Sequence, residues 1–381
     1  MCVDNNKKAF FVLLRAGLFP DHGEGVMVHD TLFMDVNWGK VYQIAQEQSV
    51  QGVVLQGIEE LRAKNIELSV PKVLLLQWIG EVQLIEQRNK EMNIFLARLI
   101  ENLKSEGIRC ALVKGQGIAQ CYERPLWRSS GDIDLLLDEE NYFKASSYLP
   151  NRANQVKENR MDIKHFEMSF GTWVVELHGT LHGEWSRRAD RVIDDIQADS
   201  FRKNNFRIWK NNNVEALLPS PDVDVLFVFS HILQHFFIGG IGLRQICDWC
   251  RLLWTFRTSL NQELLESRIR EAGLMSEWKA FGAFAVVYLG MPVGAIPLYS
   301  DDSRWKRKAS RLLDFVMETG NFGHNRDESY KMKYPVVIRL FISFRRRVKD
   351  TYKHFCIFPL DALKAWMTIW VMGVRFVIGK I

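Results

Sequence analysis

The segment Leu112-Val-Lys-Gly-Gln-Gly-Ile-Ala119 has the pattern of a buried strand, a glycine-containing turn and the start of a helix. It is followed by Arg128-Ser-Ser-Gly-Asp-Ile-Asp-Leu-Leu-Leu137, in which a loop runs into a second apolar strand. Because side chains alternate along a strand, Asp132 and Asp134 point to the same face. Two neighbouring carboxylates repel each other unless a cation neutralises them. The pattern therefore indicates a cation at the start of this strand.

A third acidic residue is expected beside this pair. The segment Trp173-Val-Val-Glu-Leu-His178 is an apolar strand, and Glu176 points away from the face that Val175 and Leu177 share. An isolated carboxylate in such a strand needs a partner. Together with Asp132 and Asp134 it would complete a three-carboxylate site, for which Mg²⁺ or Mn²⁺ is the simplest ligand.

The turn before the aspartates has the features of a phosphate-binding loop. Lys114 and Gly115 end one strand and begin a helix, where free N–H groups and a partial positive charge favour anions. A phosphate-binding turn opposite a metal-binding acidic pair is the arrangement that phosphoryl or nucleotidyl transfer requires.

Strands and helices alternate around these segments. We expect an α/β layer over residues 106–215, with an N-terminal helical region over 1–105 and a C-terminal helical region with a basic tail over 216–381. The chain beyond residue 180 is polar, and we expect irregular structure there until a helix begins near Ser220. The expected elements are strands at 108–113, 132–137, 164–170 and 172–178, and helices at 41–61 (one or two), 71–107, 141–149 and 222–256 with a break at 239–240.

The ordered blocks resemble the nucleotidyltransferase core of the DNA polymerase β superfamily, and more closely the bacterial uncharacterised nucleotidyltransferase family. The similarity runs from about Val41 to about Leu253 and includes the helix Leu226 to His235 and the segment Leu243 to Asp248. It implies an α+β or α/β nucleotidyltransferase fold flanked by helices, and transfer of a nucleoside monophosphate from an NTP to an unidentified acceptor. The turn Gly-Gln-Gly and the long gap to the aspartates differ from the usual superfamily pattern.

The resemblance also implies roles for individual residues. Asp132 and Asp134 match the metal-binding aspartates, and Glu176 matches the third carboxylate, which can also help to deprotonate the attacking hydroxyl. Gly115 matches the glycine of the phosphate-positioning turn. Lys114 and Arg128 would then contact the triphosphate by their charge and position.

Two other functions remain open from the sequence. An Asp-x-Asp pair also occurs in glycosyltransferases that bind sugar nucleotides through Mn²⁺, although the helical first hundred residues argue against a Rossmann-like half. A non-catalytic protein that binds a partner through the same fold is the second alternative.

Several polar residues in the C-terminal half have no assigned role. His231 and His235 are spaced i, i+4, which would suit zinc only if further ligands such as His178 or His182 lay within reach. We expect His235 and Asp248 to line the cleft or to hold the helical region on the core, and Arg244 to pair with Asp248. Cys247 and Cys250 are interpreted as buried structural thiols, and the role of His165 stays open.

Composition and charge limit the class of protein. The 381 residues contain 50 Lys+Arg, 45 Asp+Glu and 47% apolar residues, which excludes a disordered, collagen-like or coiled-coil chain. Six cysteines and no recognisable signal peptide favour reduced thiols and a cytoplasmic location. Residues 301–381 contain 17 Lys+Arg against 8 Asp+Glu, so the positive charge is C-terminal.

This basic region suggests an additional contact. Its arginine cluster Arg345 to Arg347 lies upstream of the apolar run Ala365 to Val374, which is ten residues long. A transmembrane helix needs about 20 apolar residues, so we predict no spanning segment. A helix that packs on the domain is the favoured interpretation, and peripheral contact with a membrane or with RNA is the alternative.

Overall fold

A mixed seven-stranded sheet forms the centre of the α+β fold in the computed structural model, which describes residues 4–20, 30–160, 164–323, 325 and 333–378. The strand order is β3-β4-β5-β2-β1-β7-β6. The pairs β2–β5 and β1–β7 are parallel and the other neighbours are antiparallel. The strands are β1 (Ala111–Val113), β2 (Asp132–Leu136), β3 (Gln155–Arg160), β4 (His165–Phe170), β5 (Trp173–His178), β6 (Phe206–Asn211) and β7 (Val214–Pro219).

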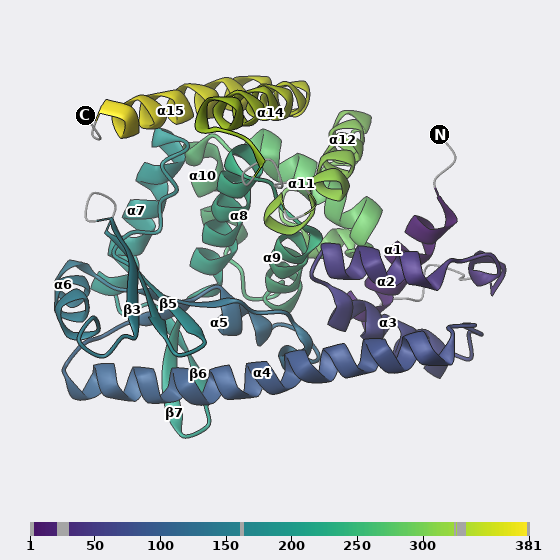
Figure 1. The fold of residues 1–381 in the computed structure, drawn as a ribbon, viewed down its shortest axis with the longest axis horizontal. Coiled ribbons are helices and arrows are strands. Elements are labelled where there is room, and N and C mark those ends of the chain that lie inside the picture. The colour runs from purple at the N-terminus through teal and green to yellow at the C-terminus, as the bar shows by residue number, and fades with distance from the viewer. Residues whose placement is uncertain (1–3, 21–29, 161–163, 324, 326–332, 379–381) are drawn as a thin grey trace.

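One face of the sheet is covered by the long helix α4 (Lys72–Ser105) and by α6 (Glu139–Tyr148). Figure 1 shows α4 running along one side of the molecule, under both the sheet and the N-terminal helices. Apolar residues at every second position of β2 and β5 face this layer, and Met92, Leu96 and Tyr142 pack against them. The acidic residues between them therefore point to the opposite face of the sheet.

The N-terminal helices α1 (Asn5–Leu18), α2 (Trp38–Glu47) and α3 (Gln51–Ala63) share one hydrophobic core with the C-terminal helices. Arg15 of α1 donates hydrogen bonds to the carbonyl groups of Val287 and Tyr288, at 2.6 and 2.9 Å. The two ends of the chain thus fold together, beside the sheet. The C-terminal helices are α8 (Pro221–Ile238), α9 (Leu243–Thr255), α10 (Gln262–Ala272), α11 (Met275–Leu289), α12 (Ser303–Thr319), α14 (Val336–Ile357) and α15 (Pro359–Ile378).

Most expected elements are confirmed, including the break between α8 and α9. Of the two alternatives for residues 41–61, the structure has two helices, α2 and α3. The prediction of irregular structure after residue 180 is wrong, because α7 (Arg187–Arg202) begins there with Ser186 as its N-cap. The hairpin β6–β7 was also not anticipated, and β7 continues past residue 215. The domain boundaries themselves stay a prediction. Cys247 and Cys250 are buried free thiols, as expected.

Candidate active site

The turn between β1 and the short helix α5 (Gly115–Ala119) lies against the first residue of β2. Lys114 and Gly115 both have positive φ, 57° and 38°. Glycine adopts this conformation freely, whereas a lysine there is strained. A Cβ on Gly115 would lie 3.4 Å from the backbone oxygen of Asp132. The backbone conformation therefore brings the phosphate-binding turn predicted from the sequence into contact with the acidic strand.

The parallel ladder between β2 and β5 brings the three predicted carboxylates together. Asp134 is the register partner of Glu176, and Asp132 lies two residues earlier on the same face. Oxygen atoms of Asp132, Asp134 and Glu176 all lie within 4.8 Å of one another. Asp134 is buried, and the other two are half-buried. This donor set and spacing suit a hard divalent cation, so the residues present fit Mg²⁺ or Mn²⁺.

Two histidines extend the cluster. Nε2 of His178 lies 2.8 Å from Oδ1 of Asp134, and Nε2 of His165 lies 3.2 Å from Oε2 of Glu176. His165 on β4 is the register partner of His178 on β5, and this pair lies two residues along the strands from the pair Glu167 and Glu176. His165, Glu176 and His178 form a second group whose atoms can hold a metal ion. The sequence signal for His178 was its position two residues after Glu176, on the same face.

The charges of the cluster are compensated from within the chain. Nζ of Lys114 lies 2.7 Å from Oδ1 of Asp134. The negative charge of Asp134, followed by burial, raises the pKa of Asp132. Burial also acts to raise the pKa of Glu176, but hydrogen bonds from His165 and His178 and the charge of Lys114 outweigh it and lower that pKa. A bound cation would replace Lys114 as the main counter-charge of Asp134.

A pocket opens on this cluster between the sheet and two helices. Val228, His231 and Ile232 of α8 line one side of it. A second side of the pocket is lined by three residues from the first two turns of α9, Arg244, Gln245 and Asp248. The remaining lining residues come from the turn and the acidic strand, and these are Lys114, Gly115, Ile118, Arg128, Gly131, Asp132 and Asp134.

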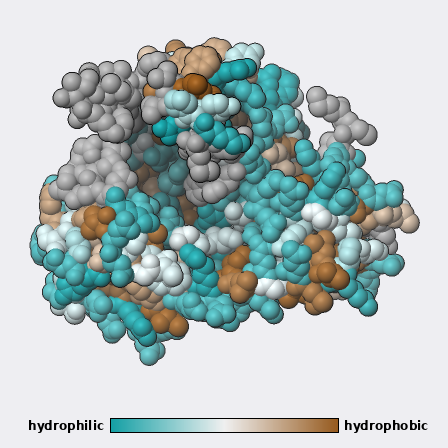
Figure 2. All heavy atoms as spheres, viewed as in Figure 1, coloured by the Kyte–Doolittle hydropathy of each residue, from teal (hydrophilic) through white to brown (hydrophobic). Residues whose placement is uncertain are grey.

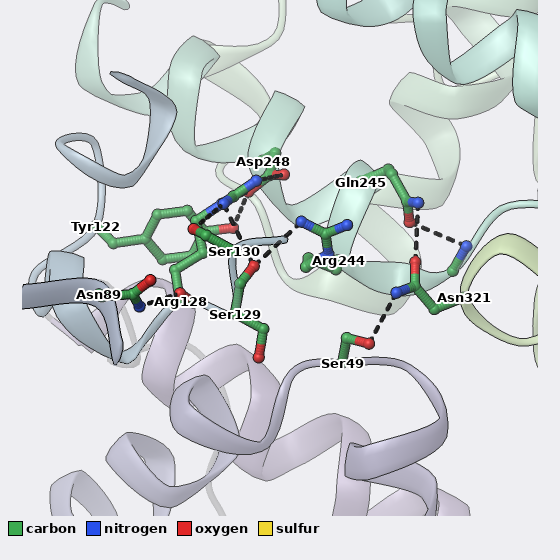
Figure 3. Close-up of polar contacts among 11 residues, drawn as sticks. Ser49, Asn89, Tyr122, Arg128, Ser129, Ser130, Arg244, Gln245, Asp248 and Asn321 are labelled. Carbon is green, nitrogen blue, oxygen red and sulfur yellow. Dashed lines mark hydrogen bonds and ion pairs between the residues drawn. The ribbon is translucent and has the colours of Figure 1, made fainter. Parts of the chain in front are cut away.

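Arg128 is held in a buried ion pair (Figure 3). Its Nε and Nη2 atoms each donate to one carboxylate oxygen of Asp248, both at 2.7 Å. The hydroxyl of Tyr122 donates to the same carboxylate at 2.8 Å, and Nη1 of Arg128 donates to Ser130 at 2.9 Å. The structure thus pairs Asp248 with Arg128, 120 residues away in the chain, where the sequence suggested Arg244.

Arg244 reaches the same loop from the opposite side. Its Nη1 donates to the backbone carbonyl of Ser129 at 3.1 Å, and Figure 3 shows its guanidinium directed toward that loop. Burial lowers the pKa of Arg244 from its ordinary value. Two arginines therefore fix the loop that leads into Asp132, and both line the pocket.

The two histidines of α8 contact each other. Their Nε2 atoms lie 3.0 Å apart. Burial, followed by the charge of Lys114, lowers the pKa of His231 well below its usual range and that of His235 to about 4. Both rings are therefore neutral at pH 7, and Nε2–H of one ring donates a hydrogen bond to Nε2 of the other. Among the residues that the structure describes, neither belongs to a group of three or more metal ligands, so the zinc alternative gains no support.

Comparison with known proteins gives one match. The family described as uncharacterised nucleotidyltransferase covers residues 34–289, which is more than half of the chain. No curated protein and no solved structure matches the chain.

Proposed function

We propose that this chain, which belongs to the uncharacterised nucleotidyltransferase family, transfers a nucleoside monophosphate from an NTP to an acceptor hydroxyl or similar group. In this reaction the acceptor oxygen bonds to the α-phosphorus and the bond to the β-phosphate oxygen breaks. Pyrophosphate leaves, and the acceptor proton passes to a base. The observation that carries the proposal is the group of carboxylates Asp132, Asp134 and Glu176, within 4.8 Å of one another beside the Lys114–Gly115 turn.

Each residue has a distinct task in this proposal. Asp132, Asp134 and Glu176 would hold Mg²⁺ or Mn²⁺, which when bound supplies charge to the attacking and leaving oxygens. Glu176 also orients the acceptor hydroxyl and accepts its proton. Lys114 would contact the triphosphate through its charge. Gly115 has no side chain, so the backbone of the turn could approach a phosphate closely.

The contribution of Arg128 is indirect in this proposal. Asp248 accepts from Nε and Nη2 of Arg128, and Ser130 accepts from its Nη1, so Arg128 fixes the loop of residues 129–131 that leads into Asp132. It also adds positive charge to the pocket wall that the triphosphate would face.

The test is the melting temperature of the protein with each NTP, with and without Mg²⁺ or Mn²⁺. A ligand at about 100 times its Kd adds about 2.7 kcal/mol to the free energy of unfolding, which raises Tm by a few degrees. The Asp134→Asn variant should lose the metal-dependent part of the shift. Glu167→Gln is the matched control, because Glu167 is the register partner of Glu176 but pairs with Lys157 at 3.1 Å.

Three outcomes would contradict the proposal. A shift with UDP-sugars in place of NTPs would indicate a glycosyltransferase. No shift with any nucleotide would indicate a non-catalytic partner-binding protein. An equal shift in Asp134→Asn and in the parent protein would show that the nucleotide binds elsewhere.

A further inference from the structure

The outward face of the C-terminal helices α14 and α15 is apolar and exposed. Leu340, Phe341, Tyr352 and Leu360 expose 65 to 72% of their surface. Figure 1 shows the two helices lying together across the end of the molecule opposite α4. In Figure 2 a cluster of brown and tan atoms lies at the top of that same edge, beside teal atoms. Contiguous exposed apolar surface of this kind marks an interaction site in proteins.

The exposed residues follow a helical repeat. On α14 they are spaced by three or four positions, which places them in one stripe along the helix. The first part of α15 continues the pattern. The stripe consists of Phe341, Phe344, Val348, Tyr352 and Phe355 on α14, and of Leu360, Leu363 and Met367 on α15.

The C-terminal end of α14 is packed on the domain, so this end of the helix is not detached. The buried ring of His354 lies 4.5 Å from that of Phe236 and 4.7 Å from that of Phe315. Ile357 at the end of the helix is also buried. Arg347 donates a hydrogen bond to the carbonyl of Ile238, the last residue of α8. The part of the stripe that carries Tyr352 and Phe355 is therefore a fixed surface of the folded protein, and Arg347 anchors the middle of the helix.

Positive charge borders the stripe. Between residues 336 and 368 the basic residues are Arg339, Arg345, Arg346, Arg347, Lys349, Lys353 and Lys364, against Asp350 and Asp361. Lys349 and Lys353 pair with Glu318 of α12, whereas Arg345 is exposed next to Phe344. Two copies of this chain would bring like charges together across the stripe. The aliphatic side chains that continue the stripe on α15, Leu360, Leu363 and Met367, offer no ring on which an RNA base could stack. A membrane with anionic headgroups offers negative charge to the basic residues and hydrocarbon to the apolar stripe, so it suits both features.

We propose that the outward face of α14 and α15 binds an anionic membrane surface. The apolar side chains would enter the boundary between headgroups and acyl chains, and Arg345, exposed beside Phe344, would lie among the anionic headgroups. No helix among the described residues has the length and hydropathy to cross a membrane, so the contact is peripheral. Helix α8 links this face to the pocket, because its last turn packs under α14 while His231 lines the pocket.

The test is co-sedimentation of the full chain with vesicles of phosphatidylcholine alone or mixed with phosphatidylglycerol. We expect binding to the mixed vesicles only, weakened by high salt. Phe341→Asp with Tyr352→Asp should lower the partition coefficient by about tenfold or more. Arg345→Gln should lower it by about fivefold. The matched control is Leu76→Asp with Leu84→Asp, since both leucines are 69% exposed on α4 and the charge change is the same.

The proposal would be overturned if the parent chain did not bind anionic vesicles. It would also be overturned if the α4 control variant lost as much vesicle binding as the stripe variant. Two further results would do the same: a dimer in solution that only the stripe variant abolishes, and binding of the parent chain to RNA but not to vesicles. The nucleotide-dependent Tm shift, measured without vesicles, should be the same in the stripe variant as in the parent protein. Failure of this proposal is therefore distinguishable from failure of the nucleotidyltransferase assignment.

Discussion

Removing the carboxylate of Asp248 should strongly destabilise the protein. Arg128 and Asp248 are each only 4% exposed, and both guanidinium bonds to the carboxylate are 2.7 Å long. Asp248→Ala leaves a guanidinium buried without its counter-charge, which costs about 3–5 kcal/mol. It also removes the acceptor of the Tyr122 hydroxyl. At about 2 °C per kcal/mol the melting temperature should fall by about 6–10 °C.

The assay is thermal unfolding of the parent protein and three variants at one pH. Arg128→Met with Asp248→Leu should lose less stability than Asp248→Ala, because no buried charge is left unpaired. Glu140→Ala, which breaks an exposed pair with Lys144, should cost less than about 1 kcal/mol. The reasoning is refuted if Asp248→Ala costs no more than Glu140→Ala, or if the double variant is the least stable of the three.

Three further perturbations test other parts of the structure. Burial, followed by the charge of Asp361, raises the pKa of Glu277 to about 8. The stability that protonated Glu277 contributes is therefore complete below the usual pKa of a glutamate and is lost as the pH rises through 8. In urea titrations the free energy of unfolding of the parent should fall relative to that of Glu277→Gln across this range, and a constant difference would contradict the raised pKa. Gly57→Ala should cost about 1–3 kcal/mol or more in the same titrations, because a Cβ there overlaps the carbonyl oxygen of Leu13 where α1 crosses α3, and a neutral effect would show that the helices can separate. Burial raises the pKa of the Cys250 thiol, so it should react with a thiol reagent only after unfolding, and labelling of the native protein at that position would refute its burial.

The face on which each acidic side chain of the cluster lies was predictable, because alternation along a strand is local. Period-two alternation around Asp132, Asp134 and Glu176 is visible in the sequence, and the structure places the three side chains on one face. The same rule applied to His178, which follows Glu176 by two residues, but its contact with Asp134 depends on which strands are neighbours. Strand order is set by long-range packing, and nothing in the segment itself specifies it.

Two other features of the structure were not predicted from the sequence, each for a different physical reason. Helix α7 carries a sequence signal, since Ala189, Val192, Ile193 and Ile196 have helical spacing after the cap Ser186, but its many charges conceal the narrow apolar stripe. The pairing of Arg128 with Asp248 has no local signal at all. Its partners are 120 residues apart, and only the packing of α9 against the loop before β2 brings them together.

The register of β5 against β2 has a consequence for how the site can change. Asp134 is opposite Glu176, so a one-residue slip of β5 would turn Glu176 into the apolar layer under α4 and α6 and would present Val175 or Leu177 to the aspartates. Insertion or deletion of a single residue within β5 therefore abolishes the third carboxylate and the core packing in one step. A change in the length of β5 therefore either keeps the alignment of the three carboxylates or removes Glu176 from the cluster, with no intermediate arrangement.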